Sequence, residues 1–137
     1  MCNVHQRIRA DHATEMAEDY VEAIADVVDR HGVCRASDLV RLFRVTHATV
    51  NNTVGRLVRD GFVTTEPYQP LNLTRKGRTL ASKCRERHEI VRVFLLALGI
   101  SEATAIADSE GIEHHVSAET LQAMSQFLKT QQFSRAD

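Results

Sequence analysis

The fold of this chain is decided by residues 44–61, which read RVTHATVNNTVGRLVRDG. Thr46 is a typical helix N-cap, and Gly61 is a typical residue after a helix end. The apolar residues between them recur at helical spacing, which predicts a helix to about Asp60. The residues expected on its inward face are Val50, Val54, Leu57 and Val58.

The segments on either side complete a recognisable order of elements. A helical pattern from Ala13 to His31 comes first, and a short helix from Ser37 to Phe43, capped near Ser37 or Ala36, follows it. After Gly61, the β-prone stretches 62–65 and 71–74 are separated by a turn-forming segment, 66–70. Helix, helix–turn–helix and hairpin in this order predict a winged helix–turn–helix.

The rest of the chain is predicted to be helical. A long helix runs from about residues 74–77 to Leu98, another from Ser101 to about Ile112, and a last one from Ser117. The predicted fold class is therefore mainly α. We expect a winged helix–turn–helix DNA-binding domain with a two-stranded wing over residues 13–78. A helical domain follows over residues 79–137.

Composition limits the classes of function. The chain has 137 residues, 43% of them hydrophobic, with no apolar run long enough to cross a membrane and no export signal. Its three cysteines include no Cys-x-x-Cys pair, which favours a reducing, cytoplasmic location. Residues 35–78 hold eight basic and three acidic side chains between net acidic flanks, as in a polyanion-binding module.

The predicted helix over residues 46–60 has a polar face suited to reading double-stranded DNA. Asn can pair with adenine, Thr can contact a phosphate or a thymine methyl group, and Arg can contact guanine or phosphate. A solvated polar face is the alternative, but residues 41–59 lack acidic side chains, whereas solvated faces usually mix both signs. The candidate DNA-binding residues are Ser37, Thr46, His47, Thr49, Asn51, Asn52 and Arg56.

A second set of residues suggests a metal site. Glu110, Glu113 and His114 are spaced to share one face of a helical turn, although a solvated acidic turn is the alternative. Asp19 and Glu22 on the first helix and His88 on the long helix complete the set. Four carboxylates and two imidazoles without a thiolate favour Mn²⁺ or Fe²⁺. Four negative charges brought together would repel, so two divalent cations are electrostatically reasonable.

Carboxylate–histidine sites also occur in metal-dependent hydrolases, so a hydrolase is an alternative interpretation of the candidate site. His88-Glu89 lacks the second histidine of a His-Glu-x-x-His motif, because Arg92 stands at that position. The chain also lacks a nucleophile elbow, a phosphate loop and a deaminase signature. We therefore predict that the protein is not an enzyme and takes no small organic substrate.

These motifs together resemble the diphtheria-toxin-repressor family of metal-dependent regulators, and more closely its manganese-sensing branch. The resemblance covers roughly residues 13–130 and rests on the stretches 18–22, 49–54, 73–77, 87–89 and 110–117. It implies a cytoplasmic, homodimeric repressor with Mn²⁺ as corepressor, in which residues 79–137 form the dimerisation and metal-sensing domain. By position, the metal ligands would be Asp19, Glu22, His88, Glu110, Glu113 and His114.

The resemblance also bears on the choice of metal and on regulation. The iron-sensing branch has Met and Cys at the positions of Asp19 and Glu110, so oxygen ligands there indicate manganese. Fe²⁺, Zn²⁺ or Cd²⁺ are expected substitutes. We expect two Mn²⁺ per subunit. We also expect that the chain lacks the SH3-like third domain of the iron-sensing members. The hypothesis is that Mn²⁺ joins the first helix to the C-terminal domain and fixes the spacing of two recognition helices. An iron- or zinc-responsive repressor and a DNA-binding module without a sensor are the alternatives.

Overall fold

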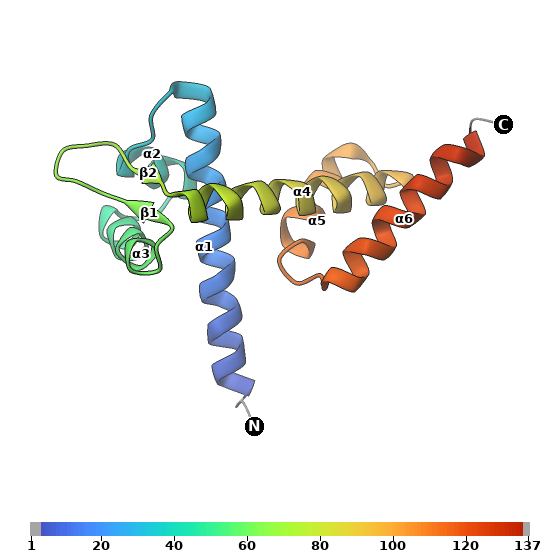
Figure 1. The fold of residues 1–137 in the computed structure, drawn as a ribbon, viewed down its shortest axis with the longest axis horizontal. Coiled ribbons are helices and arrows are strands. Elements are labelled where there is room, and N and C mark those ends of the chain that lie inside the picture. Colours follow the sequence, from blue (N-terminus) through green and yellow to red (C-terminus); the bar gives the residue numbers. More distant parts are fainter. Residues whose placement is uncertain (1–3, 136–137) are drawn as a thin grey trace. The chain divides into compact units, whose positions relative to one another are not determined.

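The computed structural model describes the backbone of residues 4–135 and the side chains of residues 4, 5 and 12–131. Six helices and one hairpin follow one another in the described chain (Figure 1). The prediction of a mainly helical chain with a two-stranded wing is confirmed. The elements are α1 (Val4–His31), α2 (Ala36–Phe43), α3 (His47–Arg59), β1 (Val63–Thr64), β2 (Asn72–Leu73), α4 (Arg75–Ala97), α5 (Glu102–Ile112) and α6 (Ala118–Arg135).

The chain divides into two compact units, of which the first ends at Ser82 and the second begins at Lys83. The first unit contains α1 to β2 and the first two turns of α4, and the second contains the rest of α4, α5 and α6. Our division into domains 13–78 and 79–137 places the boundary slightly earlier and stays a prediction. Residues 136 and 137 of the predicted second domain lie outside the described residues.

Helix α3 forms because its ends are specified locally. The N–H of Thr49 donates to the Thr46 hydroxyl at 3.1 Å, which makes Thr46 the N-cap. After the helix, Gly61 has a φ of +82°, a conformation that glycine adopts without strain. Leu57 is buried as predicted, but Val58 is 37% exposed. The prediction for Val58 was wrong because one step along a helix turns the side chain by about 100°.

Two other helix starts differ from the prediction. Helix α1 begins at Val4 rather than Ala13. The N-cap of α2 is Arg35, not Ser37 or Ala36, and its backbone N–H donates to Oδ2 of Asp38 at 2.8 Å. The Asp38 carboxylate thus supplies the reciprocal half of a capping box.

The wing is a short antiparallel hairpin in which Val63 faces Leu73 and Thr64 faces Asn72. Its strands are shorter than predicted, and a longer loop joins them (Figure 1). Leu71 at the base of the wing donates its N–H to the Cys34 carbonyl at 2.8 Å. The wing is thereby joined to the core of the first unit, which contains Tyr20, Ala23, Ile24, Cys34, Leu39, Val50, Val54, Leu57, Val63 and Leu71.

The second unit has a smaller core, made of Val91 and Leu95 on α4 and Ala105 on α5. Helix α6 starts at a capped turn, where the N–H of Thr120 donates to the Ser117 hydroxyl at 3.2 Å. Leu121 and Met124 of this helix pack against the core. In the part of the chain that the structure describes, no helix combines the length and the apolar character needed to span a membrane.

Candidate metal centre and DNA interface

Three of the predicted metal ligands come together within the second unit. His88 lies on α4, and Glu113 and His114 directly follow α5. Oε2 of Glu113 is 3.7 Å from Nδ1 of His88, and Oε1 of Glu113 is 3.5 Å from Nε2 of His114. The side chains of Glu113 and His114 are only 2% and 3% exposed. A buried carboxylate thus lies between two imidazole rings.

This donor set suits a divalent cation. The two nitrogen–oxygen separations are longer than ordinary hydrogen bonds, so the three groups are neighbours without being tightly hydrogen-bonded to one another. A buried carboxylate beside two imidazole nitrogens is stabilised by a positive charge, which a metal ion can provide. Imidazole nitrogen and carboxylate oxygen are ligands that first-row divalent metals accept. The residues therefore fit a bound metal ion.

Ser109 is a neighbour of this cluster that the sequence reasoning missed. Its fully buried hydroxyl lies 3.5 Å from Nδ1 of His88 and donates to the Ile106 carbonyl at 3.0 Å. Ser109 precedes Glu113 by one helical turn, and Glu113 donates its N–H to the Ser109 carbonyl at 3.1 Å. That i, i+4 spacing was the available signal, since it puts Ser109 and Glu113 on the same side of the turn.

Glu110 differs from the other two candidates of its segment. Helix α5 ends at Ile112, and Glu110 in its last turn is exposed, whereas Glu113 and His114 have buried side chains. The structure therefore brings Glu113 and His114 into the buried cluster and leaves Glu110 at the surface. The expected single face for all three residues is only partly formed.

The remaining two candidates belong to the first unit. Asp19 and Glu22 lie on α1, three residues apart, and both are half-buried. This spacing puts two carboxylates on neighbouring positions of one helix surface. Each is also engaged in polar or electrostatic interactions.

Glu89, next to His88, is held by an arginine. The guanidinium of Arg92 donates to both carboxylate oxygens of Glu89, through Nη2 at 2.7 Å and Nε at 3.1 Å. These hydrogen bonds lower the pKa of Glu89 from its ordinary value. Because Arg92 occupies this carboxylate, Glu89 does not resemble the general base of a metal-dependent hydrolase.

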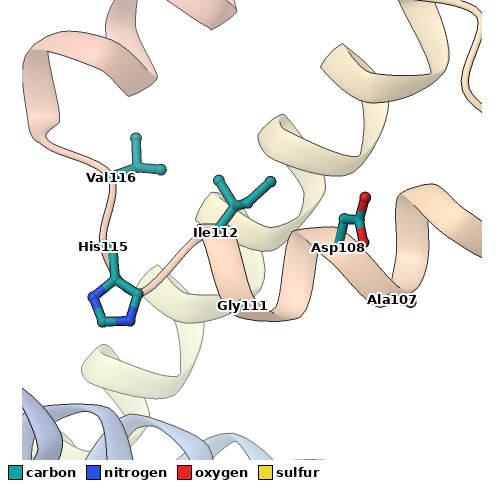
Figure 2. A pocket seen from close by; sticks show the side chains of 6 residues that line it. All are labelled: Ala107, Asp108, Gly111, Ile112, His115 and Val116. Atoms are coloured by element: carbon teal, nitrogen blue, oxygen red, sulfur yellow. The ribbon is translucent and has the colours of Figure 1, made fainter.

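His115, the neighbour of His114, is exposed and lines a shallow depression on the second unit. Figure 2 shows its ring on the segment after α5, with Ile112 and Val116 nearby and Asp108 on the helix itself. The consecutive histidines thus have different environments, one buried beside Glu113 and one at the surface.

The candidate DNA-binding residues are nearly all exposed. The exception is Ser37 on α2, which is half-buried. Helix α3 packs its apolar side into the core of the first unit and leaves its polar side at the surface. A helix presented in this way can enter a major groove. The exposed candidates are Thr46, His47, Thr49, Asn51, Asn52 and Arg56.

The fold and these two groups of residues define a class of protein, a winged-helix DNA-binding protein with a candidate metal-binding cluster. Two family models match the chain in consecutive segments. Residues 12–71 match the N-terminal DNA-binding domain of iron-dependent repressors. Residues 74–135 match their metal-binding and dimerisation domain.

Curated transcriptional regulators are similar to this chain over most of its length. The chain is 42% identical to the transcriptional regulator MntR of Salmonella typhimurium over 124 residues, which cover 90% of this chain and 79% of that protein. It is 38% identical to the regulator MntR of Geobacillus kaustophilus, over 76% of this chain and 74% of that protein. The chain therefore belongs to the iron-dependent repressor family of metal-dependent transcriptional regulators, among its MntR-type members.

Solved structures agree with this fold. The manganese regulator SloR superposes with a TM-score of 0.72 at 25% identity, over 82% of this chain and 53% of SloR. A manganese-dependent transcriptional repressor in complex with manganese superposes with a TM-score of 0.75 at 23% identity, over 82% of this chain and 52% of that one. The chain spans about half the length of these structural relatives.

Proposed function

We propose that this protein is a manganese(II)-dependent transcriptional repressor of manganese-uptake genes. The observation that carries the proposal is the buried Glu113 carboxylate between the imidazoles of His88 and His114. It lies in the segment that matches the metal-binding and dimerisation domain. The names of the similar MntR proteins support manganese as the physiological metal.

The proposed metal ligands come from both units of the chain. An oxygen-rich ligand set binds Mn²⁺ in preference to ions that favour thiolate ligands. Several carboxylates in one site favour a pair of cations. We therefore propose two Mn²⁺ per subunit, with Fe²⁺, Zn²⁺ or Cd²⁺ as substitutes. The ligands are Asp19, Glu22, His88, Glu110, Glu113 and His114.

The proposed partners are a double-stranded DNA operator and a second copy of the chain, acting in the cytoplasm. Two copies of α3 in a symmetric dimer would enter successive major grooves, with Asn51, Asn52 and Arg56 toward the bases. Residues 13–78 would supply the DNA-binding function, and residues 79–137 dimerisation and metal sensing. We propose no catalytic activity, because the similar proteins are transcriptional regulators.

Metal binding regulates such a protein only if the DNA-competent arrangement binds metal better than the other arrangements. Ligands drawn from α1 and from the second unit would restrict motion between the two when metal binds. A hundredfold preference corresponds to about 2.7 kcal/mol of coupling, within the usual range for allosteric proteins.

The test is DNA binding at fixed salt, titrated with Mn²⁺, Fe²⁺ and Zn²⁺ separately and reversed with a chelator. A duplex selected from a random library by the Mn²⁺-loaded chain serves as the operator. We expect Mn²⁺ to switch on tight, chelator-reversible DNA binding. The readout is activation of DNA binding and not metal affinity, because affinity for divalent ions follows the Irving–Williams order, in which Mn²⁺ is weakest. Activation by Fe²⁺ or Zn²⁺ alone would reassign the metal. Binding that ignores all three ions would refute the sensor function.

A further inference from the structure

The C-terminal end of α3, the proposed recognition helix, is attached to the start of α4 by specific contacts. Lys76, in the first turn of α4, donates from Nζ to the carbonyl of Asp60 at 2.7 Å. Asp60 is the C-cap of α3, where carbonyl groups lack partners within the helix and the helix dipole favours a positive charge. Nζ of Lys76 also lies 4.4 Å from the centre of the Phe62 ring, a cation–π contact.

Thr74 makes the second attachment. Its hydroxyl donates to the carbonyl of Gly61 at 2.6 Å and accepts the N–H of Gly77 at 3.1 Å. The same hydroxyl therefore caps α4 and holds Gly61, the second residue after α3. The backbone N–H of Thr74 adds a bond to the Phe62 carbonyl at 2.9 Å.

Gly77 allows the two segments to approach this closely. A Cβ atom at Gly77 would collide with the carbonyl oxygen of Phe62, and that oxygen belongs to the backbone and cannot swing away. Glycine is thus required at this position by the contact itself. Thr74, Lys76 and Gly77, here named the clasp, hold α3 and the beginning of α4 together as one body.

We propose that the clasp makes Thr74 and Lys76 positioning residues for DNA recognition, because it couples the recognition helix to the helix that bears a metal-ligand candidate. Helix α4 begins at the clasp, is continuous to Ala97 and carries His88. A change at His88 on metal binding can reach α3 through this helix, in addition to any route through α1. The inference rests on the proposed metal-dependent repression.

A simpler role for Lys76 is a contact with a DNA phosphate, since it is a surface cation near the wing. The two roles differ in one measurable respect. Loss of a phosphate contact weakens DNA binding by the same factor with and without metal. Loss of coupling lowers the ratio of the metal-free to the Mn²⁺-loaded dissociation constant for DNA.

The experiment measures that ratio by fluorescence anisotropy, with the full chain and a duplex selected by the wild type with Mn²⁺. We expect Lys76→Met and Thr74→Val each to lower the ratio by about tenfold. Lys76→Arg and Thr74→Ser, which keep the donor groups, should retain most of it. Mn²⁺ affinity without DNA should stay within about twofold of wild type, because linkage changes only the coupled binding.

Matched controls separate coupling from charge and from helix stability. Arg75→Met removes a neighbouring exposed cation, and Thr79→Val removes a hydroxyl that bonds within α4, to the Arg75 carbonyl. Both should leave the ratio unchanged. A Lys76→Met chain that weakens equally in both metal states, or keeps the wild-type ratio, overturns the clasp proposal alone. A wild type that ignores Mn²⁺ overturns the proposed function and the coupling with it.

Discussion

The two units bury their apolar residues to very different extents. Among the described residues, the core of the first unit contains ten buried side chains drawn from α1, α2, α3, the wing and the loop between α1 and α2. The core of the second unit contains three, from α4 and α5. Since burial of apolar surface is the main favourable term in folding, the first unit can be stable by itself. The second unit has much less to hold it together.

The second unit leaves several apolar side chains at its surface despite its small core. Ile106 and Ile112 on α5 and Phe127 on α6 are each about 40% exposed. A helical unit with a small core and exposed apolar residues gains stability when another surface covers them. A second copy of the chain is the occupant we propose, in agreement with the family's dimerisation domain.

Truncation of a core leucine in each unit tests this difference directly, and it should give the largest effect. Leu57→Ala should lower the free energy of unfolding of the first unit by about 3–4 kcal/mol, because Leu57 is 2% exposed within a complete core. Leu95→Ala, at 8% exposure in the smaller core, should cost about 2 kcal/mol in dilute protein. Urea unfolding, monitored by hydrogen exchange of the amides of each unit, measures both losses of unfolding free energy. Equal losses of unfolding free energy in the two variants would show that the two cores do not differ in their contribution to stability.

Features of the first unit that have a local signal could be predicted from the sequence, and features that depend on packing could not. Helix α3 was predicted nearly to the residue, because its cap at Thr46 and its stop at Gly61 are local signals. Arg35 was missed as the N-cap of α2, because an arginine side chain gives no capping signal, and the bond depends on Asp38. Val58 was assigned to the wrong face because helical period alone does not say how wide the buried side is.

The candidate metal centre was predictable in residue type and not in burial. Spacing along the chain placed Glu110, Glu113 and His114 on one turn, but the end of α5 at Ile112 gives them different exposures. Ser109 was missed because its proximity to His88 depends on how α5 packs against α4. The i, i+4 spacing indicated only that Ser109 and Glu113 share a side of the turn, whereas the approach to His88, 21 residues away, leaves no pattern in a single sequence.

The second prediction concerns the buried and the exposed carboxylate of the candidate centre. Glu113→Gln keeps the shape of the side chain and removes its charge, so it should weaken the Mn²⁺ response of DNA binding about a hundredfold. Glu110→Gln should have a smaller effect, because Glu110 is exposed. Glu119→Gln, at an exposed position in the first turn of α6, is the matched control. Anisotropy titrations give all three responses, and a full response in Glu113→Gln would remove it from the ligand set.

A third prediction tests whether the exposed apolar side chains of the second unit form the dimer interface. Ile106→Lys should raise the dimer dissociation constant at least about tenfold, since each copy would bury a charge in place of an apolar side chain. The matched control is Leu42→Lys on α2, where a leucine of the first unit is 56% exposed. Sedimentation equilibrium without DNA compares the two. A weaker dimer only in Leu42→Lys would assign the interface to the first unit.

The smallest expected effect comes from a thiol in the core of the first unit. Burial, with a further contribution from the Asp38 charge, raises the pKa of Cys34 from 9.0 to about 11. The folded state therefore holds its thiol proton more tightly than the unfolded state does. This contribution to stability is complete below pH 9 and is lost as the pH rises toward 11.

At pH 9.5 the loss should be about 0.8 kcal/mol relative to neutral pH. Other groups titrate in the same range, so the quantity to measure is the difference between wild type and Cys34→Ala. Urea unfolding from pH 7 to pH 10.5 should show the wild type losing more stability than the variant as pH rises. A constant difference would mean that the thiol is open to water in the folded state. Cys34 lies at the base of the wing, where its carbonyl accepts the N–H of Leu71. A water-accessible thiol there would mean that the core of the first unit is less tightly packed at this point than the structure indicates.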